Sequence, residues 1–339
     1  MQINKPFFIA EISANHLGSF DRAKELVIAA ANSGASAVKF QTYTADTMTL
    51  DLDSLRVSKG HQLWGDKKLY DLYQLAHTPW QWHEELFDLC RKIGVIPFSS
   101  PFDLSAIEFL ESLGAPMYKI ASLETSDHRL IRSAAETGKP MFISTGATTW
   151  DEVEDLVNVV NQTGNNKITL MLCTSSYPSN PIDANLNRLS LLKSNFGFEI
   201  GLSDHTLGIG VSVAAIALGA TVIEKHFTLK RSDGGPDSAF SLEPNEFKLL
   251  VQEGNSAYKS LGKTKWQISD SENESRRLRR SLYIVADVKK GDLITDKNLR
   301  AIRPGAGCSP KYYESLIGKY FTEDFSLGTP MQSSYASNK

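Results

Sequence analysis

Cysteine is scarce in this sequence, which has three in 339 residues. Cys90, Cys173 and Cys308 are widely separated and form no CxxC pair, so they indicate reduced thiols rather than a disulfide framework. The chain also lacks an apolar stretch long enough to cross a membrane, and its start, MQINKPFFIAEIS, lacks the layout of a signal peptide. We therefore expect a cytoplasmic protein with no membrane partner.

An excess of positive charge is absent as well. The 36 Lys and Arg residues are outnumbered by 39 Asp and Glu residues, which gives a formal net charge of −3 and no general attraction to nucleic acid. A basic run from Arg276 to Arg280 is local and is explained by a solvated face or an anchoring contact. Because 41% of the residues are hydrophobic, the chain can build a proper core.

One pattern recurs from the N-terminus to about residue 260: a short apolar run, polar residues, a turn, and an amphipathic segment of helical period. Eight strands alternating with helices predict an α/β fold, a (β/α)8 TIM barrel, because eight parallel strands close a barrel. An open doubly wound sheet is the alternative, but the first strand lacks its Gly-rich turn. The runs are FFIAEIS, SAVKFQT, VIPFSSP, PMYKIAS, PMFISTG, ITLMLCTSSYP, FEIGLSDH and TVIEKHF.

The segments that interrupt this pattern divide the chain. About fifty residues separate the second run from the third, and a barrel loop of that length usually shapes the site. We expect the second barrel helix over residues 80–94. The polar stretch 263–280 predicts a linker, and the short strand patterns of 281–339 predict a small domain. The catalytic barrel would therefore occupy residues 1–262.

Polar residues end all eight predicted strands, and the carboxyl ends of barrel strands converge on the face that holds the active site. Two lysines, Lys39 and Lys119, together with several hydroxyls predict an anion site, most simply for a phosphate with a carboxylate. Lysines that extend out of the barrel mouth are the alternative. The hydroxyls are those of Ser99, Ser100, Ser122, Ser144, Thr145, Thr174, Ser175 and Ser203.

Two histidines, His205 and His226, end neighbouring predicted strands. Adjacent strands lie about 4.8 Å apart, so both imidazoles could reach one cation. Imidazole with oxygen ligands suits Mn, Co, Fe or Zn, or Mg where water fills the shell. Two histidines are too few for a closed structural site, so open positions predict a Lewis-acid role. A single strand-end histidine would more often be a packing residue.

Several motifs, in this order along the chain, resemble the sialic acid synthase family. They are AEISANHLGS, AVKFQTYTADT, YKIASLE, STG, CTSSYP, GLSDHT, EKHFTL and GGPDSAFSLEP. The later stretch RRSLYIVADVKKGDLITDKNLRAIRPGAG resembles the antifreeze-like (SAF, β-clip) domain of that family. Within the family, LWGDKKLYDLYQLAHTPWQWH and GGPDSAFSLEP are most similar to the pseudaminic acid synthases.

The resemblance implies a metal-dependent transferase. Phosphoenolpyruvate would condense with an N-acetylated aminosugar, open-chain 2,4-diacetamido-2,4,6-trideoxy-altrose, to give pseudaminic acid and phosphate. C3 of phosphoenolpyruvate attacks the aldehyde, which the metal polarises; water adds at C2, and phosphate leaves by C–O cleavage. A different aminosugar, giving N-acetylneuraminate or legionaminate, is the alternative.

The family's site residues carry over to matching positions. His205 and His226 match ligands of the divalent metal (Mn, Mg or Co), and the catalytic set is Glu11, Glu124 and Lys119. In this set Glu124 orients the attacking water and Glu11 faces the sugar and the metal-bound water. The residues matching phosphoenolpyruvate contacts are Lys39, Gln41, Ser100, Lys119, Ser122, Ser144 and Ser203.

The sugar side is matched by Ser175, Tyr177, Asp237 and Arg303. The family's counterpart of Arg303 enters the barrel of a partner subunit, which implies a domain-swapped homodimer. Ser175 stands where neuraminate members often have Asn, and Lys230 where the family commonly has Asp.

Two other functions stay open at this point. Lys119 could form an imine with a ketone donor, which would make the protein a Schiff-base aldolase that needs no metal. A non-catalytic sugar-binding protein is the other alternative, although both lysines, both histidines, Glu11 and Glu124 are all present.

Overall fold

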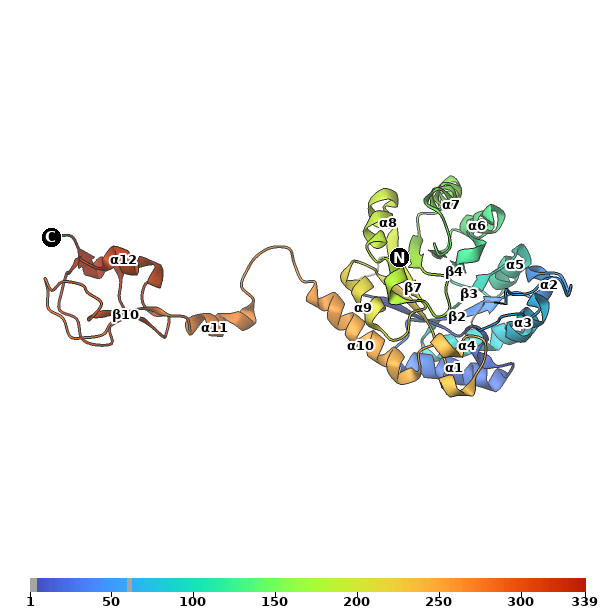
Figure 1. Ribbon diagram of the computed structural model, residues 1–339, viewed down its shortest axis with the longest axis horizontal. Coiled ribbons are helices and arrows are strands. Elements are labelled where there is room, and N and C mark those ends of the chain that lie inside the picture. The colour runs from blue at the N-terminus through green and yellow to red at the C-terminus, as the bar shows by residue number, and fades with distance from the viewer. Residues whose placement is uncertain (1–4, 60–62) are drawn as a thin grey trace. The chain divides into compact units, whose positions relative to one another are not determined.

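The computed structural model describes residues 5–59 and 63–339, and the chain divides into two compact units, residues 1–262 and 263–339. In the first unit the strands form a closed parallel barrel in chain order, β1 to β8 (Figure 1). The predicted TIM barrel is confirmed, and the open doubly wound sheet is wrong. The strands are β1 (Phe7–Glu11), β2 (Ala37–Thr42), β3 (Ile96–Pro101), β4 (Tyr118–Ile120), β5 (Met141–Ser144), β6 (Ile168–Cys173), β7 (Glu199–Asp204) and β8 (Val222–His226).

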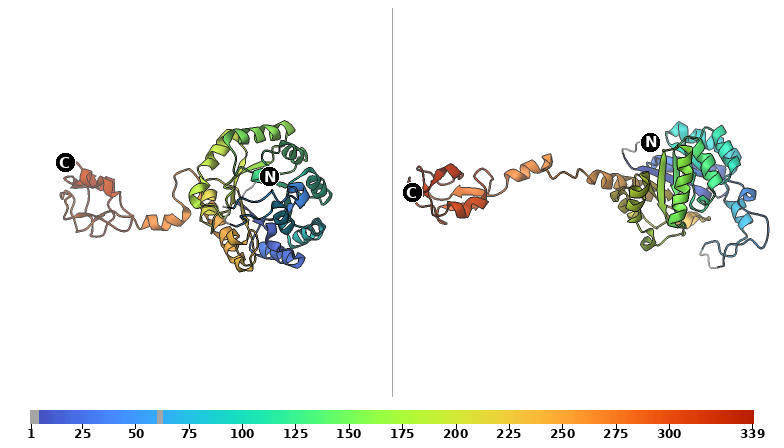
Figure 2. Two further views of the ribbon diagram at one scale, coloured as in Figure 1. Left: turned by 45° about the vertical axis from the view of Figure 1, so that its right-hand side comes forward. Right: turned by 90° about the horizontal axis from the view of Figure 1, so that it is seen from above.

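Helices surround this barrel on its outside, as the two views of Figure 2 show. Several of them follow a residue whose side chain caps the free backbone N–H groups; Thr149, for example, forms a reciprocal capping box with Glu152. The helices are α1 (Phe20–Asn32), α2 (Ala45–Met48), α3 (Leu69–Ala76), α4 (His83–Ile93), α5 (Leu104–Ser112), α6 (His128–Glu136), α7 (Trp150–Thr163), α8 (Arg188–Phe196), α9 (Gly210–Ala217) and α10 (Pro244–Ser260).

The helix expected over residues 80–94 differs at its start. Residues Trp80–Trp82 form a 3-10 turn, and α4 begins at His83. The helix ends where expected, because Gly94 takes the left-handed conformation (φ 84°) that closes a helix without steric cost.

Apolar side chains fill the lower part of the barrel interior. Because side chains alternate along a strand, Phe7 and Ile9 of β1 point inward together with Glu11 one step further on. The polar ends of the strands therefore lie directly above a dry apolar layer. This layer contains Phe7, Ile9, Ala37, Phe98, Met117, Phe142, Met171 and Val222.

The long connection between β2 and β3 contains α2, α3 and α4. Residues 60–62 of this connection lie outside the described residues. Just after them, the Trp64 indole Nε1–H donates to the Pro236 carbonyl at 3.1 Å, and the Trp64 ring lies 5.7 Å from that of Tyr177. The connection thus contacts the loop that follows β8 and a residue that follows β6.

The second unit has its own small core. Strands β9 (Ser281–Ile284) and β10 (Leu299–Ile302) pair antiparallel, as do β11 (Tyr320–Phe321) and β12 (Ala336–Ser337). Its core residues are Leu282, Ile284, Val288, Ile294, Leu299, Leu316, Phe321 and Met331.

The unit also contains two short helices, α11 (Asn273–Arg277) and α12 (Tyr313–Leu316). The first of them lies inside the segment 263–280, for which we retain the proposal of a linker. Among the described helices of both units, none is long and apolar enough to span a membrane.

The packing of α10 on the barrel predicts an effect of Gly254→Ala. A Cβ at Gly254 would lie 2.7 Å from Phe8 Cζ and 2.8 Å from Ile216 Cδ1, both of which are buried. We expect this overpacking to lower the free energy of unfolding by about 1–3 kcal/mol, measured by urea denaturation followed by circular dichroism. Gly210→Ala, also in a helix but with no atom within 4 Å of its Cβ, is the matched control and should be neutral or slightly stabilising. Equal effects would contradict the overpacking argument.

Candidate active site

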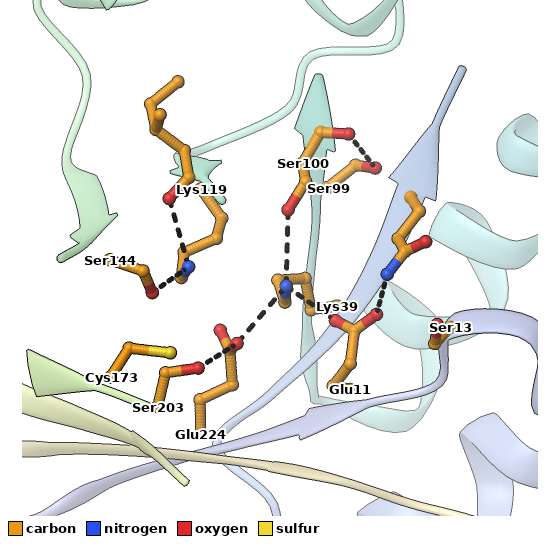
Figure 3. Close-up of polar contacts among 12 residues, drawn as sticks. Glu11, Ser13, Lys39, Ser99, Ser100, Lys119, Ser144, Cys173, Ser203 and Glu224 are labelled. Carbon is orange, nitrogen blue, oxygen red and sulfur yellow. Dashed lines mark hydrogen bonds and ion pairs between the residues drawn. The ribbon is translucent and has the colours of Figure 1, made fainter. Parts of the chain in front are cut away.

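Lys39 lies between two carboxylates at the mouth of the barrel (Figure 3). Its Nζ is 2.8 Å from Glu11 Oε2 and 3.3 Å from Glu224 Oε1, and it donates to Ser100 Oγ at 3.3 Å. The side chains of Lys39, Glu11 and Glu224 are 5%, 1% and 4% exposed. Buried charges of this kind are stable only when they are paired, so these three side chains depend on one another.

Strand register brings these residues together. Glu11 is the register partner of both Lys39 on β2 and His226 on β8, and Ser203 on β7 is the partner of Glu224. The amide of Gln41, two residues after Lys39 and on the same face, donates to Glu11 Oε1 at 3.0 Å.

Burial and pairing set the protonation of the cluster. Burial raises the pKa of Glu11 to about 7, against the lowering effect of Lys39. Burial would lower the pKa of Lys39, but Glu11 and Glu224 outweigh it, and the pKa of Lys39 is raised. Burial also acts to raise the pKa of Glu224, but Lys119 and Lys39 hold it below its usual range. At neutral pH the cluster therefore has one ammonium group, Lys39, one ionised carboxylate, Glu224, and one carboxyl, Glu11, close to its midpoint.

The second lysine, Lys119, lies on the opposite side of Glu224 from Lys39 (Figure 3). Its Nζ donates to Ser144 Oγ at 2.5 Å and to the Ile120 carbonyl at 3.1 Å. Ser203 donates to Glu224 Oε1 at 3.1 Å, which adds another hydroxyl to the same cluster. Burial lowers the pKa of Lys119. The predicted convergence of two lysines and several serines is thus present, and none of them extends out of the mouth.

Gly146 lies close to three side chains near this cluster. Its backbone N–H donates to Ser122 Oγ at 3.1 Å. A Cβ at this position would lie 2.7 Å from Ser122 Oγ and 3.1 Å from Cys173 Sγ, and would collide with Ser175 Oγ. The turn after β5 therefore approaches these three side chains as closely as it does because residue 146 has no side chain.

The two histidines face one another, with ring centres 5.3 Å apart. His205 Nδ1 lies 3.0 Å from the Thr174 carbonyl, which can only accept, so Nδ1 carries a proton. Burial would lower the pKa of His205, but Cys173 and the Thr174 carbonyl outweigh it, and the pKa of His205 is raised. Within the described part of the chain, His226 Nδ1 is buried and has no hydrogen-bond partner. Burial and then His205 hold the pKa of His226 well below its usual range, so its ring is neutral at pH 7.

These features fit a divalent cation. Metal–nitrogen bonds of about 2.0–2.1 Å place the centres of two imidazoles that share a cation about 4.5–5.2 Å apart, close to the observed separation. Among residues 5–59 and 63–339, no group of three or more His, Cys, Asp or Glu side chains is arranged to hold a metal ion. The histidine pair therefore offers an open site whose other positions would fall to water or substrate.

Aromatic rings cover the histidine pair. Tyr177 lies 4.5 Å from His205 and Phe240 lies 4.9 Å from His226, measured between ring centres, and Tyr177 and Phe240 are themselves 5.4 Å apart. Beside them, buried Asp237 accepts from Ser13 Oγ at 2.5 Å, which fixes the loop after β8 to the turn after β1.

Two predicted site residues, Glu124 and Arg303, and the family departure Lys230 take no part in the hydrogen bonds described above. Glu124 ends the 3-10 turn Ser122–Glu124 that follows β4 and is half-buried; burial raises its pKa to about 7, partly offset by Lys119. Arg303 is exposed and belongs to the second unit. Lys230, the unexpected charge of the β8 loop, is also exposed.

Four residues of the site had been given no role from the sequence. Glu224 could have been found, because it lies two residues before His226 and so faces the same way. Cys173, Ser13 and Gly146 gave no such signal: the first looks like a core thiol, and Ser13 takes part only because its backbone is left-handed (φ 46°).

Family comparison agrees with this geometry. Residues 26–266 match the model of the NeuB family, and residues 279–333 match that of the SAF domain. The chain belongs to the NeuB family. The resemblance to sialic acid synthases that its motifs suggested, and the SAF domain at its C-terminal end, are therefore confirmed.

Individual relatives cover nearly the whole chain. A pseudaminic acid synthase of Helicobacter pylori is 43% identical over 330 residues, 97% of each chain. An N,N'-diacetyllegionaminic acid synthase of Campylobacter jejuni is 36% identical and covers 95% of this chain and 98% of its own. Among solved structures, an N-acetylneuraminic acid synthetase of Leptospira borgpetersenii in complex with citrate has a TM-score of 0.73 at 33% identity, covering 80% of this chain and 90% of its own.

The raised pKa of Glu124 predicts a pH-dependent effect of Glu124→Gln. The Glu124 carboxyl has a pKa of about 7 in the folded protein, against 4.5 for a free glutamate, so the folded state binds more protons between these pH values. The protonated Glu124 carboxyl therefore makes its full contribution to stability below pH 4.5, and this contribution is lost as the pH rises through 7. We expect the variant to match the wild type at pH 5 and to exceed its free energy of unfolding at pH 8 by about 1–2 kcal/mol in urea titrations.

The control for this experiment is Glu108→Gln, which removes an exposed glutamate of α5. It should give the same difference from the wild type at both pH values. A constant difference for Glu124→Gln as well would show that its carboxyl titrates as an exposed group does.

Proposed function

We propose that this protein condenses phosphoenolpyruvate with open-chain 2,4-diacetamido-2,4,6-trideoxy-altrose to give pseudaminic acid and phosphate. The observation that carries the proposal is the buried pair of lysines, Lys39 and Lys119, beside the histidine pair at one barrel mouth. The 43% identity to a pseudaminic acid synthase over 97% of the chain supports this sugar rather than another.

The positive charges of Lys39 and Lys119 suit the two anionic groups of phosphoenolpyruvate. Its phosphate and carboxylate would replace Glu11 and Glu224 as partners of the two lysines, and serine hydroxyls would donate to the same oxygens. Because the pKa of Glu11 is already about 7, arrival of an anion favours protonation of Glu11 and relieves the repulsion. The proposed contacts are Lys39, Gln41, Ser100, Lys119, Ser122, Ser144 and Ser203.

The histidines define where the sugar reacts. A divalent cation (Mn, Mg or Co) held by His205 and His226 would supply Lewis-acid polarisation of the sugar aldehyde. C3 of phosphoenolpyruvate forms a bond to the aldehyde carbon, whose oxygen takes a proton and becomes a hydroxyl. Glu11, near its midpoint at neutral pH and in register with His226, is the proposed donor of that proton.

Completion of the reaction needs water at C2. Glu124, with a pKa of about 7, is the proposed group that orients this water and accepts its proton. The C2–O bond to phosphate then breaks: the phosphate leaves with the electron pair and takes up the proton of the C2 hydroxyl, and C2 becomes the ketone. Lys119 stabilises the charge of the departing phosphate.

The sugar itself would lie under the aromatic rings and the β8 loop. We propose Ser175, Tyr177 and Asp237 as its contacts in the barrel, with Arg303 supplied by a second copy of the chain in a domain-swapped homodimer. Ser175 and Tyr177 both follow β6, beside His205, which is where the aldehyde end of the sugar would be held.

A Schiff-base aldolase is the second candidate, and one observation favours it: burial lowers the pKa of Lys119, as an imine-forming lysine requires. The same lysine, however, is engaged by Ser144 Oγ and the Ile120 carbonyl. Borohydride trapping of a substrate on Lys119 with full activity in EDTA would establish the aldolase instead.

The proposed reaction is tested by phosphate release from phosphoenolpyruvate. We expect release with 2,4-diacetamido-2,4,6-trideoxy-altrose, its loss in EDTA and its recovery with Mn²⁺, because the aldehyde needs the cation held by the histidines. N-acetylmannosamine and the diacetamido precursor of legionaminate are the comparison sugars.

Each other outcome of this assay has a distinct meaning. Release with N-acetylmannosamine alone would keep the chemistry and replace the sugar. Saturable sugar binding without phosphate release from any sugar would identify a non-catalytic binding protein.

Trp64 is expected to influence which sugar is accepted. Its indole N–H is engaged by the Pro236 carbonyl, so its ring offers an apolar surface that suits a 6-deoxy methyl better than a hydroxyl. Trp64→Ala should lower kcat/KM for the deoxy sugar about tenfold more than for N-acetylmannosamine, since a hydrophobic wall discriminates a hydroxyl only modestly. Trp80→Ala is the matched control, because the Trp80 indole also donates to a backbone carbonyl, that of Tyr43. Equal losses with both sugars would contradict this role.

A further inference from the structure

A buried ion pair lies behind the two histidines. Asp204 on β7 and Lys225 on β8 are register partners, and their side chains are 1% and 0% exposed. Lys225 Nζ lies 3.2 Å from Asp204 Oδ2. Because side chains alternate along a strand, both residues point away from the barrel mouth, toward the helices, while His205 and His226 point into it. None of the roles proposed above uses this pair.

The pair is fully engaged with its surroundings. Asp204 Oδ1 accepts from the backbone N–H of Thr206 at 2.8 Å and from its hydroxyl at 2.7 Å. Asp204 Oδ2 accepts from Ser212 Oγ of α9 at 2.6 Å, and Lys225 Nζ donates to the Thr206 carbonyl at 2.5 Å. Buried ion pairs are often no more stabilising than apolar residues of the same size, so stability alone is a weak reason for this arrangement.

The hydrogen bonds of the Asp204–Lys225 pair involve the residues next to the two histidines in the chain. Asp204 and Thr206 are the immediate neighbours of His205, and Lys225 is the immediate neighbour of His226. The pair therefore fixes the backbone on both sides of His205 and ties it to the residue before His226. The His205 ring is held separately by the Thr174 carbonyl, 3.0 Å from its Nδ1.

We propose that Asp204 and Lys225 are positioning residues that hold the two imidazoles at the spacing needed to share one divalent cation. This inference rests on the proposed metal role of His205 and His226. The observed separation of 5.3 Å between ring centres is the quantity that the pair would maintain. Groups that orient metal ligands from behind typically change metal affinity 10- to 100-fold when they are removed.

The test is the Mn²⁺ affinity of the protein without substrates, measured by isothermal titration calorimetry. Lys225→Met keeps the length of the side chain and removes its charge and hydrogen bonds. We expect its Kd for Mn²⁺ to rise about 10- to 100-fold. Its phosphate release should recover when Mn²⁺ is raised, which damage to the fold would not allow.

A matched control separates positioning from stability. Asn165 is also a buried polar residue of the barrel, and its amide donates to Ala135 O at 3.1 Å and Lys139 O at 2.9 Å, at the opposite end of the strands. Asn165→Ala should lower the melting temperature and leave the Mn²⁺ affinity unchanged. If Lys225→Met lowers the melting temperature but binds Mn²⁺ as the wild type does, the pair is only structural and the inference is wrong.

A milder variant covers the case in which Lys225→Met does not fold. Ser212→Ala removes one hydrogen bond to Asp204 and should weaken Mn²⁺ binding about threefold to tenfold; an unchanged affinity would overturn the inference. His205→Ala identifies which proposal has failed. If the wild type binds Mn²⁺ and His205→Ala does not, a wild-type affinity of Ser212→Ala refutes only the positioning role. If the wild type does not bind Mn²⁺, both the metal role of the histidines and the positioning role are refuted.

Discussion

The buried Lys39, held between Glu11 and Glu224, is the interaction on which the rest of the site depends. Removing one partner of a buried ion pair typically costs about 3–5 kcal/mol, because the remaining charge has no water to solvate it. The apolar layer of the barrel interior lies directly beneath these charges and keeps them dry. The protein keeps these buried charges at one end of the barrel. A dianionic or trianionic substrate that replaces the carboxylates would bind to lysines that are already desolvated and fixed in place.

The barrel strands allow such a site because each strand has two faces. On β7 and β8 the inward residues form the proposed metal and anion site, and the outward residues Asp204 and Lys225 form a bonded pair against α9. A change in strand register would move both sets together, so the geometry of the mouth and the packing of the helices specify the same register. The function of the inward face thus constrains residues that never touch a substrate.

Much of the fold and part of the site could be predicted from the sequence. The eight strands were evident because each apolar run is short and followed by polar residues, and Lys39, Lys119, His205 and His226 could be aligned at one end because parallel strands share a direction. The contact between Ser13 and Asp237 could not be predicted, because it joins residues 224 positions apart through a left-handed turn. The close approach of Gly146 to Ser122 likewise depends on loop conformation, and periodicity carries no information on that.

The division between strands and loops also bears on what distinguishes members of this family. The charged layer is made by strand ends; in the proposed function it binds phosphoenolpyruvate, which reacts with any of these aminosugars, so it would not select one of them. Selection has to come from the surfaces above it, where Trp64 and Tyr177 meet the loop after β8. Those surfaces belong to connections that tolerate insertion and exchange, whereas the strand ends do not. One barrel can therefore keep its chemistry while its loops change the sugar, which is consistent with relatives of 43% and 36% identity that carry different product names.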